Sequence, residues 1–342
     1  MKNVIRQSIL ACISMLFFSS IQAQTSFTAG DTPIEVTTIA QNLHVPWELV
    51  WGPDDHIWFT ERDCTIGRLN PETGAITTLV SIADCYEQQE SGLLGMVLHP
   101  DFANAPYAYV VYNYSSSGNI KEKLVRYTYN MSNNTLGSPI TMIDNIGGAA
   151  IHNGSRLLIL EDNTLLMTTG DASDTSTSQD LSNLNGKFLR FNLDGTIPAN
   201  NPNPNSYVYS FGHRNAQGLT LGTNGIIYSS EHGPTSDDEL NIIEMNRNYG
   251  WPTVAGFCNT TNEQNFCNAN NVVEPLRAWT PTLAVAGLAY YDNPAIPEWQ
   301  NNLLLCNLKE RDIRLLQLSE DGLQIVGEAV SYTHLTLPTN GC

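Results

Sequence analysis

The chain has 342 residues, of which 34 are acidic and 16 are basic, so its formal net charge at pH 7 is −18. So acidic a protein is poorly suited to nucleic acid or to an anionic membrane, whereas bound cations are compatible with it. A chain of this length usually forms two domains, but all-β propellers and barrels reach this size as one unit.

Residues 1–23 have the parts of a secretory signal peptide. Lys2 and Arg6 are basic, residues 9–18 are apolar, and residues 21–23 provide a small-residue cleavage site. The apolar part is shorter than the roughly 20 residues that a spanning helix needs, and no other stretch qualifies. We therefore expect a secreted protein, most simply periplasmic, with no membrane span.

Seven cysteines are present, and export favours disulfides. Cys64 and Cys85 flank one strand-and-turn unit, and Cys258 and Cys267 flank one loop, so these are the preferred pairs. Six mature cysteines still allow 15 full connectivities. No spacing of cysteines or histidines suggests zinc.

An internal repeat organises the chain. Each copy has an apolar strand, a turn with Asp or Asn and Gly or Pro, an aromatic-aliphatic strand and a further strand. Five copies begin at Pro46, Gly92, Ser155, Gln217 and Ala286. Sheets repeated radially describe a β-propeller, whereas a sandwich or jelly roll does not explain the repetition. We predict one all-β propeller domain over residues 24–330, almost without helices.

Individual strands and loops can also be predicted. Residues 34–40 are expected to form a strand that closes the ring by completing the last blade. Residues 192–206 are expected to be a loop between units. Strands are predicted at 225–231 and 239–245, with the acidic turn EHGPTSDDE between them.

A histidine and a carboxylate are predicted to meet at one rim of a blade. His152 precedes a strand, and Asp171 ends the next strand. If the two strands are antiparallel, both side chains reach the same rim. A carboxylate beside an imidazole fixes its tautomer and raises its basicity, as a general base requires. Structural pairing is the alternative.

Further polar residues follow short apolar strands. Arg214 and Asn215 suit a planar, anionic ligand, although a surface salt bridge is the alternative. Gly233 and Pro234 offer two adjacent carbonyls close to the acidic residues 237–239, which are ligands that Ca²⁺ prefers. A solvated turn is the alternative there.

With these residues assembled, the chain resembles the glucose/sorbosone dehydrogenase family from about residue 33 to about residue 328. These are soluble pyrroloquinoline quinone (PQQ)-dependent aldose dehydrogenases with six-bladed propellers. The resemblance rests on ordered motifs: PWELVWGPDDHIWFTER, ESGLLGMVLHPDF, HNGSRL, TTGDASD, LNGKFLRFNLDGTIP, SFGHRNAQGL, SEHGPTSDDELNII and NYGWP.

The resemblance implies catalytic roles. His152 would take the proton of the anomeric hydroxyl, with Asp171 orienting it, while hydride passes from C1 of the aldose to PQQ and a lactone forms. A Ca²⁺ held by the carbonyls of Gly233 and Pro234 would polarise the quinone. Arg214 would stabilise charge developing on the quinone oxygen.

Other residues match binding positions of the family. Asn215 would lie beside Arg214 at the quinone. Thr282 and Lys309 match residues that hold PQQ carboxylates, and Glu90 matches a polar residue at the rim. Ligands of a second, structural Ca²⁺ are matched by Glu239 and the carbonyl of Tyr249.

The chain also departs from the family pattern. Ile151 and the stretch 283–287 differ from it, and residues 331–342 form a tail that matches nothing in it. We therefore expect an incomplete sixth blade, without the two arginines that clamp PQQ in the family, and weak PQQ binding.

Two other classes of function stay open at this point. One is a Ca²⁺-dependent lactonase on a six-bladed propeller, and the other is a non-catalytic propeller that binds sugar or protein. The sequence leaves open the sugar, the electron acceptor and whether the chain forms an oligomer.

Overall fold

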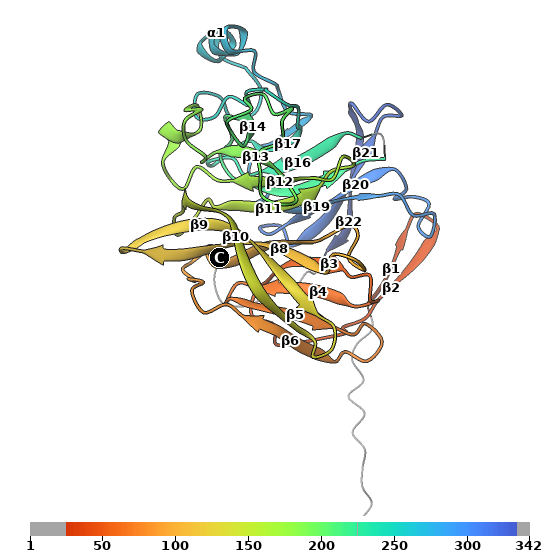
Figure 1. Ribbon diagram of the computed structural model, residues 1–342. Coiled ribbons are helices and arrows are strands. Elements are labelled where there is room, and N and C mark those ends of the chain that lie inside the picture. The colour runs from red at the N-terminus through yellow and green to blue at the C-terminus, as the bar shows by residue number, and fades with distance from the viewer. Residues whose placement is uncertain (1–24, 224, 334–342) are drawn as a thin grey trace, which may run out of the picture.

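The computed structural model describes residues 25–223 and 225–333, and nearly all of its regular structure is β-strand (Figure 1). Five antiparallel sheets of four strands follow one another along the chain, and neighbouring strands in each sheet are consecutive in sequence. They coincide with the five predicted repeats, and we call them blades one to five. The all-β propeller is therefore confirmed.

The strands have the following bounds. Blades one and two contain β3 (Pro46–Trp51), β4 (Ile57–Glu61), β5 (Thr65–Leu69), β6 (Ile76–Ser81), β7 (Leu93–Leu98), β8 (Tyr107–Ser116), β9 (Asn119–Asn130) and β10 (Thr135–Gly147). Blades three and four contain β11 (Gly154–Ile159), β12 (Thr164–Thr169), β13 (Lys187–Asn192), β14 (Val208–Phe211), β15 (Ala216–Leu221), β16 (Ile227–Glu231), β17 (Asp238–Ile242) and β18 (Arg277–Trp279). Blade five contains β19 (Val285–Tyr291), β20 (Asn302–Asn307), β21 (Asp312–Leu318) and β22 (Ile325–Thr333).

The first strands of successive blades contact one another, in the order β3, β7, β11, β15 and β19. Apolar cores then join each blade to the next. Trp58 of blade one packs against Tyr129 of blade two, and Leu124 of blade two lies in one core with Phe191 of blade three. Two further cores continue through blades four and five. Burial between sheets therefore stabilises the ring of blades.

Blade five and blade one have no shared core among the residues that the structure describes. Leu49 and Trp51 on β3 are 60% and 62% exposed, and Val326 on β22 is 64% exposed. The remaining β-structure is a hairpin of β1 (Thr25–Ala29) and β2 (Thr32–Val36), so no sixth four-stranded sheet is formed within 25–223 and 225–333.

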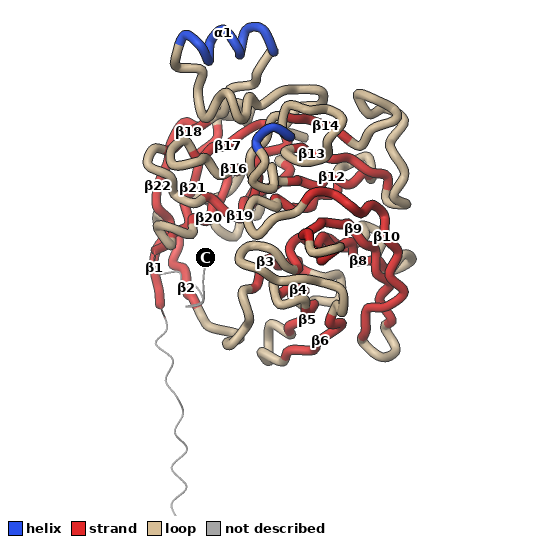
Figure 2. Tube along the Cα trace, turned by 90° about the vertical axis from the view of Figure 1, so that its left-hand side faces the viewer, coloured by secondary structure: helices blue, strands red, loops and turns tan. Residues whose placement is uncertain are grey.

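The hairpin corrects the prediction for residues 34–40. β2 ends at Val36. A short turn joins it to β1, and the two strands of five residues pair along their whole length. The hairpin packs beside blade five (Figure 2): the ring centroids of Phe27 and Tyr332 are 5.1 Å apart, and Glu298 Oε1 accepts the backbone N–H of Asp31 at 3.0 Å. It does not add a strand to that blade.

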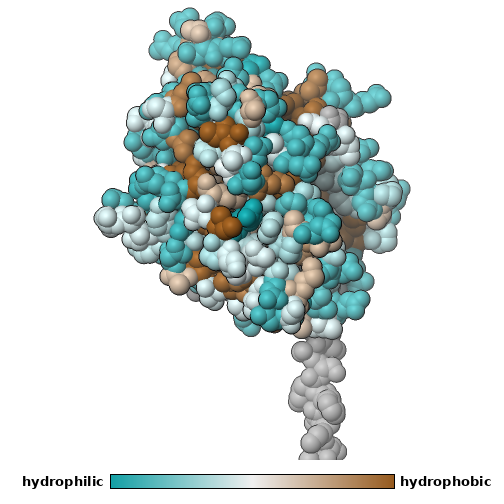
Figure 3. All heavy atoms as spheres, viewed as in Figure 1, coloured by the Kyte–Doolittle hydropathy of each residue, from teal (hydrophilic) through white to brown (hydrophobic). Residues whose placement is uncertain are grey.

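Two loops also differ from the predictions. Residues 192–206 join β13 to β14 inside blade three, so they do not separate units. The connection between β17 and β18 carries the helix α1 (Thr261–Asn270), which the sequence analysis missed. Thr260 and Glu263 form its capping box, and none of its residues is buried, so it projects as a hydrophilic knob (Figure 3). The predicted strands at 225–231 and 239–245 are β16 and β17, with shifted ends.

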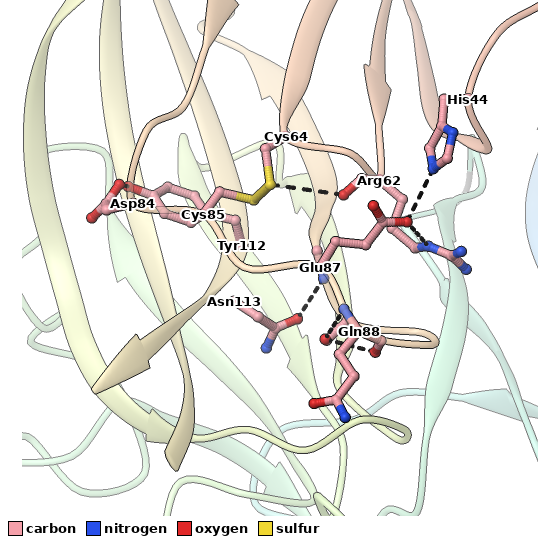
Figure 4. The surroundings of a disulfide bond; sticks show 11 residues. His44, Arg62, Cys64, Asp84, Cys85, Glu87, Gln88, Tyr112 and Asn113 are labelled. Carbon is pink, nitrogen blue, oxygen red and sulfur yellow. Dashed lines mark hydrogen bonds and ion pairs between the residues drawn. A yellow bond between two sulfur atoms is a disulfide. The ribbon is translucent and has the colours of Figure 1, made fainter. Parts of the chain in front are cut away.

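Both preferred disulfides are present. Cys64 pairs with Cys85, and Cys258, just before α1, pairs with Cys267 inside that helix. The first ties the turn after β4 to the segment that leads into blade two (Figure 4). In the same segment, Glu87 Oε1 lies 3.1 Å from both His44 Nε2 and Arg62 Nε.

No helix within 25–223 and 225–333 has the length and apolar character to span a membrane. The predicted signal peptide, residues 1–23, and residues 334–342 of the predicted tail lie outside the described residues.

Candidate active site

The polar residues of the predicted site lie at one rim of the propeller. The first strand of each blade begins at this rim, and the second strand ends at it. In blade three, Gly154 pairs with Thr169, so His152 and Asp171 meet just beyond the pairing. Ala216 pairs with Glu231 in blade four and Val285 with Asn307 in blade five. The same geometry therefore brings Arg214 close to Gly233, and Thr282 close to Lys309.

The predicted histidine–carboxylate pair is formed. His152 Nδ1 lies 2.9 Å from Asp171 Oδ1, and the Asp171 side chain is only 1% exposed. The Ser173 N–H also donates to Oδ1 at 2.9 Å, and the Trp251 indole N–H donates to Oδ2 at 2.9 Å. The Asp171 carboxylate accepts a hydrogen bond from Nδ1 of His152. The neutral imidazole therefore carries its proton on Nδ1 and has a lone pair at Nε2.

Arg214 lies on the other side of that imidazole. Its Nη2 is 3.0 Å from His152 Nε2, and its Nη1 donates to the carbonyl of His232 at 3.1 Å. Its buried Nε has no hydrogen-bond partner among the described residues. Burial lowers the pKa of Arg214, and the carboxylates of Asp171 and Glu231 oppose that change. A guanidinium at this rim suits an anionic, oxygen-rich ligand.

A buried pair orients the turn that carries Arg214. Glu231 Oε1 accepts the backbone N–H groups of Arg214 and Asn215, and Glu231 Oε2 lies 2.9 Å from His213 Nδ1. Ser210 Oγ lies 2.9 Å from His213 Nε2, which gives the spacing of a Ser–His–Glu triad. Ser210 and His213 are 0% exposed, so this triad acts as a structural brace.

Asn215 and Glu90 brace the loop that carries His152. Asn215 Oδ1 accepts the Gly154 N–H at 3.0 Å, and Glu90 Oε2 accepts the His152 N–H at 3.1 Å. The two donors come from one loop and the two acceptors from the starts of blades four and two. Both predicted residues are therefore at the site, next to the base.

A small cavity beside Arg214 is lined by all four residues that were predicted to bind metal. These are Gly233, Pro234, Glu239 and Tyr249. Burial raises the pKa of Glu239 to about 8, and the nearby carboxylate of Glu231 adds to this. A divalent cation would offset both effects, and carbonyl and carboxylate oxygens are the donors that Ca²⁺ prefers.

No group of three or more His, Cys, Asp or Glu side chains within 25–223 and 225–333 is placed to hold a metal ion. A Ca²⁺ in this cavity would therefore depend on backbone carbonyls, as the resemblance implies. The donor set fits such an ion, with Gly233 and Pro234 facing the same cavity as Glu239.

Asp238 ties this cavity to blade five. Its Oδ1 accepts the Gly233 N–H at 2.9 Å, and its Oδ2 accepts the N–H groups of Leu283 and Ala284, both at 2.7 Å. The adjoining Thr282 offers its carbonyl to Lys309 Nζ at 3.0 Å, so these two predicted residues also lie together. Lys309 is exposed at this rim.

Sequence reasoning missed two residues that organise the site, Glu231 and Trp251, which hold predicted residues in place through hydrogen bonds. It singled out Asp238 as a carboxylate near a cation, whereas the structure shows Asp238 accepting backbone N–H groups, including that of Gly233. Trp251 lies in the NYGWP motif, and Glu231 ends a predicted strand, so both had a signal in the sequence. Their partners lie far along the chain, which local patterns do not reveal.

The fold and the site together define a β-propeller with a histidine–carboxylate pair and a half-buried arginine at one rim. The family model described as Glucose / Sorbosone dehydrogenase matches residues 43–336. The chain therefore belongs to the glucose/sorbosone dehydrogenase family.

Individual proteins agree with this assignment. "Quinoprotein glucose dehydrogenase B" of Acinetobacter calcoaceticus is 36% identical over 293 residues, which cover 73% of this chain and 61% of that protein. "Aldose sugar dehydrogenase YliI" of Escherichia coli is 27% identical over 310 residues, which cover 86% and 83%. The PQQ-bound aldose sugar dehydrogenase of Streptomyces coelicolor has a TM-score of 0.75 at 31% identity, covering 86% of this chain and 83% of that one.

Proposed function

We propose that this protein is an exported oxidoreductase that oxidises an aldose at C1 to the lactone, with PQQ as electron acceptor and Ca²⁺ beside the quinone. The observation that carries the proposal is the meeting of His152, Asp171 and Arg214, joined by contacts of 2.9 and 3.0 Å at one rim. Relatives named as quinoprotein and aldose sugar dehydrogenases support it.

His152 is the residue that moves the proton. Asp171 holds the imidazole with its proton on Nδ1, so Nε2 accepts the proton of the C1 hydroxyl. The imidazolium that forms is stabilised by the buried Asp171 carboxylate. This step leaves negative charge on the sugar oxygen and prepares C1 to lose a hydride.

Arg214 and its neighbours would hold the cofactor. Its guanidinium, which uses two of its five N–H donors in the contacts with His232 and His152, would bind a quinone oxygen, and Lys309 and Thr282 would hold PQQ carboxylates. Ca²⁺ would be held by the carbonyls of Gly233 and Pro234, with Glu239 and Tyr249 contributing to a second ion. PQQ, when bound, supplies a two-electron acceptor for the hydride of C1.

The first test is dye-linked aldose oxidation by the purified protein with PQQ and Ca²⁺ in excess. We expect turnover that needs both cofactors, and a decrease in kcat of about 10²–10⁴-fold in His152→Ala, which is the usual contribution of a general base. His99→Ala is the matched control, because His99 follows β7 at the opposite rim. Its activity should equal that of the wild type.

Activity without PQQ, or full activity in His152→Ala, would contradict the proposal. Hydrolysis of a lactone by the protein with Ca²⁺ but without PQQ would instead support the Ca²⁺-dependent lactonase alternative.

A further inference from the structure

Trp251 is the side chain that touches both halves of the site. Its indole N–H donates to Asp171 Oδ2 at 2.9 Å, and the Arg214 guanidinium carbon lies 5.4 Å from its ring centroid. We propose that Trp251 is a positioning residue, which acts on the base through Asp171 and supports Arg214 through its ring. This inference rests on the proposed function and adds to it a residue that sets the geometry of the reaction.

The hydrogen bonds of Asp171 show why a further donor matters. Oδ1 accepts from both His152 and Ser173, whereas Trp251 is the donor to Oδ2. A carboxylate that is 1% exposed and has lost its donor at one oxygen pays a desolvation cost or rotates to find another donor. Rotation would change which oxygen faces the imidazole. The indole N–H therefore fixes the plane of the carboxylate and, through it, the orientation of His152.

Trp251 is itself held by groups other than Asp171. Its backbone N–H donates to the Gly212 carbonyl at 3.0 Å, and its carbonyl accepts from Gln179 Nε2 at 2.7 Å. Gln179 and Asn248 are paired by reciprocal amide hydrogen bonds of 2.9 Å. Gly212 is required there, because a Cβ on it would lie 2.3 Å from Asn248 Oδ1. The backbone of Trp251 is thus fixed by contacts that do not involve Asp171.

The decisive variant is Trp251→Phe, which removes the N–H and keeps an aromatic ring beneath Arg214. We expect kcat to fall about tenfold, while KM for the aldose and the affinity for PQQ, measured by titration, change less than about threefold. Trp251→Leu removes the ring as well, and we expect it also to weaken PQQ binding. A loss confined to kcat separates positioning of the base from binding.

Trp58→Phe is the matched control. Trp58 also donates its indole N–H to a carboxylate, Asp54 Oδ1, at 2.9 Å, and it is fully buried in the core between blades one and two. Both variants should therefore lose thermal stability, but only Trp251→Phe should lose kcat. Wild-type kcat in Trp251→Phe, or an equal loss of kcat in Trp58→Phe, would overturn the inference while the wild type still turns over.

A second measurement needs no turnover. The indole N–H proton resonance of Trp251, assigned by its disappearance in Trp251→Phe, should exchange slowly with solvent in the cofactor-free protein and faster in Asp171→Ala. If the wild type oxidises no aldose, the proposed function fails, and this measurement still decides the contact. Slow exchange that depends on Asp171 supports it, and fast exchange in the wild type overturns it.

Discussion

At the residue scale, the polar groups of the site are held by partners from other blades. Asp171 of blade three is fixed by Trp251, which lies between β17 and β18 of blade four, and Gly154 of blade three is bonded to Asn215. Such bonds leave little freedom to the side chains that would act on a substrate. Preorganisation of this kind is what electrostatic catalysis requires.

This scale also shows where prediction from sequence succeeded. His152 and Asp171 flank two neighbouring strands, so antiparallel pairing alone places them at one rim, and the structure joins them at 2.9 Å. The bond from Trp251 to Asp171 spans 80 residues along the chain and joins parts of different blades. No periodicity or turn signal encodes such a contact.

Glu122 on β9 provides a prediction about pH. It is 1% exposed, and burial raises the pKa of its carboxyl well above the usual range. Ser155 Oγ lies 2.8 Å from Glu122 Oε2 and 3.2 Å from the Asn153 carbonyl oxygen. The serine has one proton to donate, so a protonated Glu122 satisfies the whole chain of contacts.

The pKa of Glu122 is higher in the folded state than in the unfolded state, so the stability of the protein depends on pH. The unfolded state ionises Glu122 above about pH 4.3, whereas the folded state keeps the proton, so the free energy of unfolding falls as the pH rises between the two pKa values. Glu122→Gln removes this dependence. We expect it to be more stable than the wild type, with a difference that grows by about 1 kcal/mol or more from about pH 5 to about pH 8.

Urea unfolding at several pH values measures this difference. Glu72→Gln, on an exposed turn, is the control and should follow the wild type. A stability difference between Glu122→Gln and the wild type that does not change with pH would refute a protonated Glu122.

At the scale of the elements, a buried lysine holds one of the loops at the rim. The loop between β12 and β13 begins at the site and is fixed by Lys187, which is 0% exposed. Lys187 Nζ donates to the carbonyls of Thr177, Ser178 and Asn185 at 2.8, 3.0 and 2.7 Å. Burial lowers the pKa of this amine to about 7, and the carboxylate of Asp180 opposes the change.

Lys187→Met tests that bracing. It keeps the length of the side chain and removes three hydrogen bonds to carbonyl groups, so we expect the free energy of unfolding to fall by about 3 kcal/mol. Urea unfolding at about pH 6, where the amine is charged, measures it. Lys121→Met, at a partly exposed position, should change stability by less than about 0.5 kcal/mol. Equal effects of the two substitutions would refute the bracing role.

The elements were predicted unevenly, for physical reasons. Repeating apolar strands locate the five blades, because each sheet must bury its faces against its neighbours. The helix α1 has a capping box at Thr260 and Glu263 but buries no residue, so its sequence has no apolar stripe to reveal it. Residues 192–206 have the composition of a surface loop. This composition is the same for a loop within a blade and for a loop between two blades, so it does not locate the blade boundary.

At the scale of the molecule, the ring of blades places loops from blades two to five around one rim. Glu90, His152, Arg214 and Lys309 come from four successive blades. The innermost strands that lead to them contact one another in order, and apolar cores lock the blades together. A shift of one blade would therefore disturb the contacts of its neighbours at the site.

The central claim is that aldose electrons pass to PQQ at the rim that holds His152 and Arg214. An anaerobic single-turnover measurement tests it most directly. The protein is loaded with PQQ and Ca²⁺, aldose is added without dye, and reduction of bound PQQ is followed by absorbance together with the sugar product. We predict one lactone formed for each PQQ reduced, and reduction about 10²–10⁴-fold slower in His152→Ala that still binds PQQ. Bound PQQ that stays oxidised in the wild type would contradict the account.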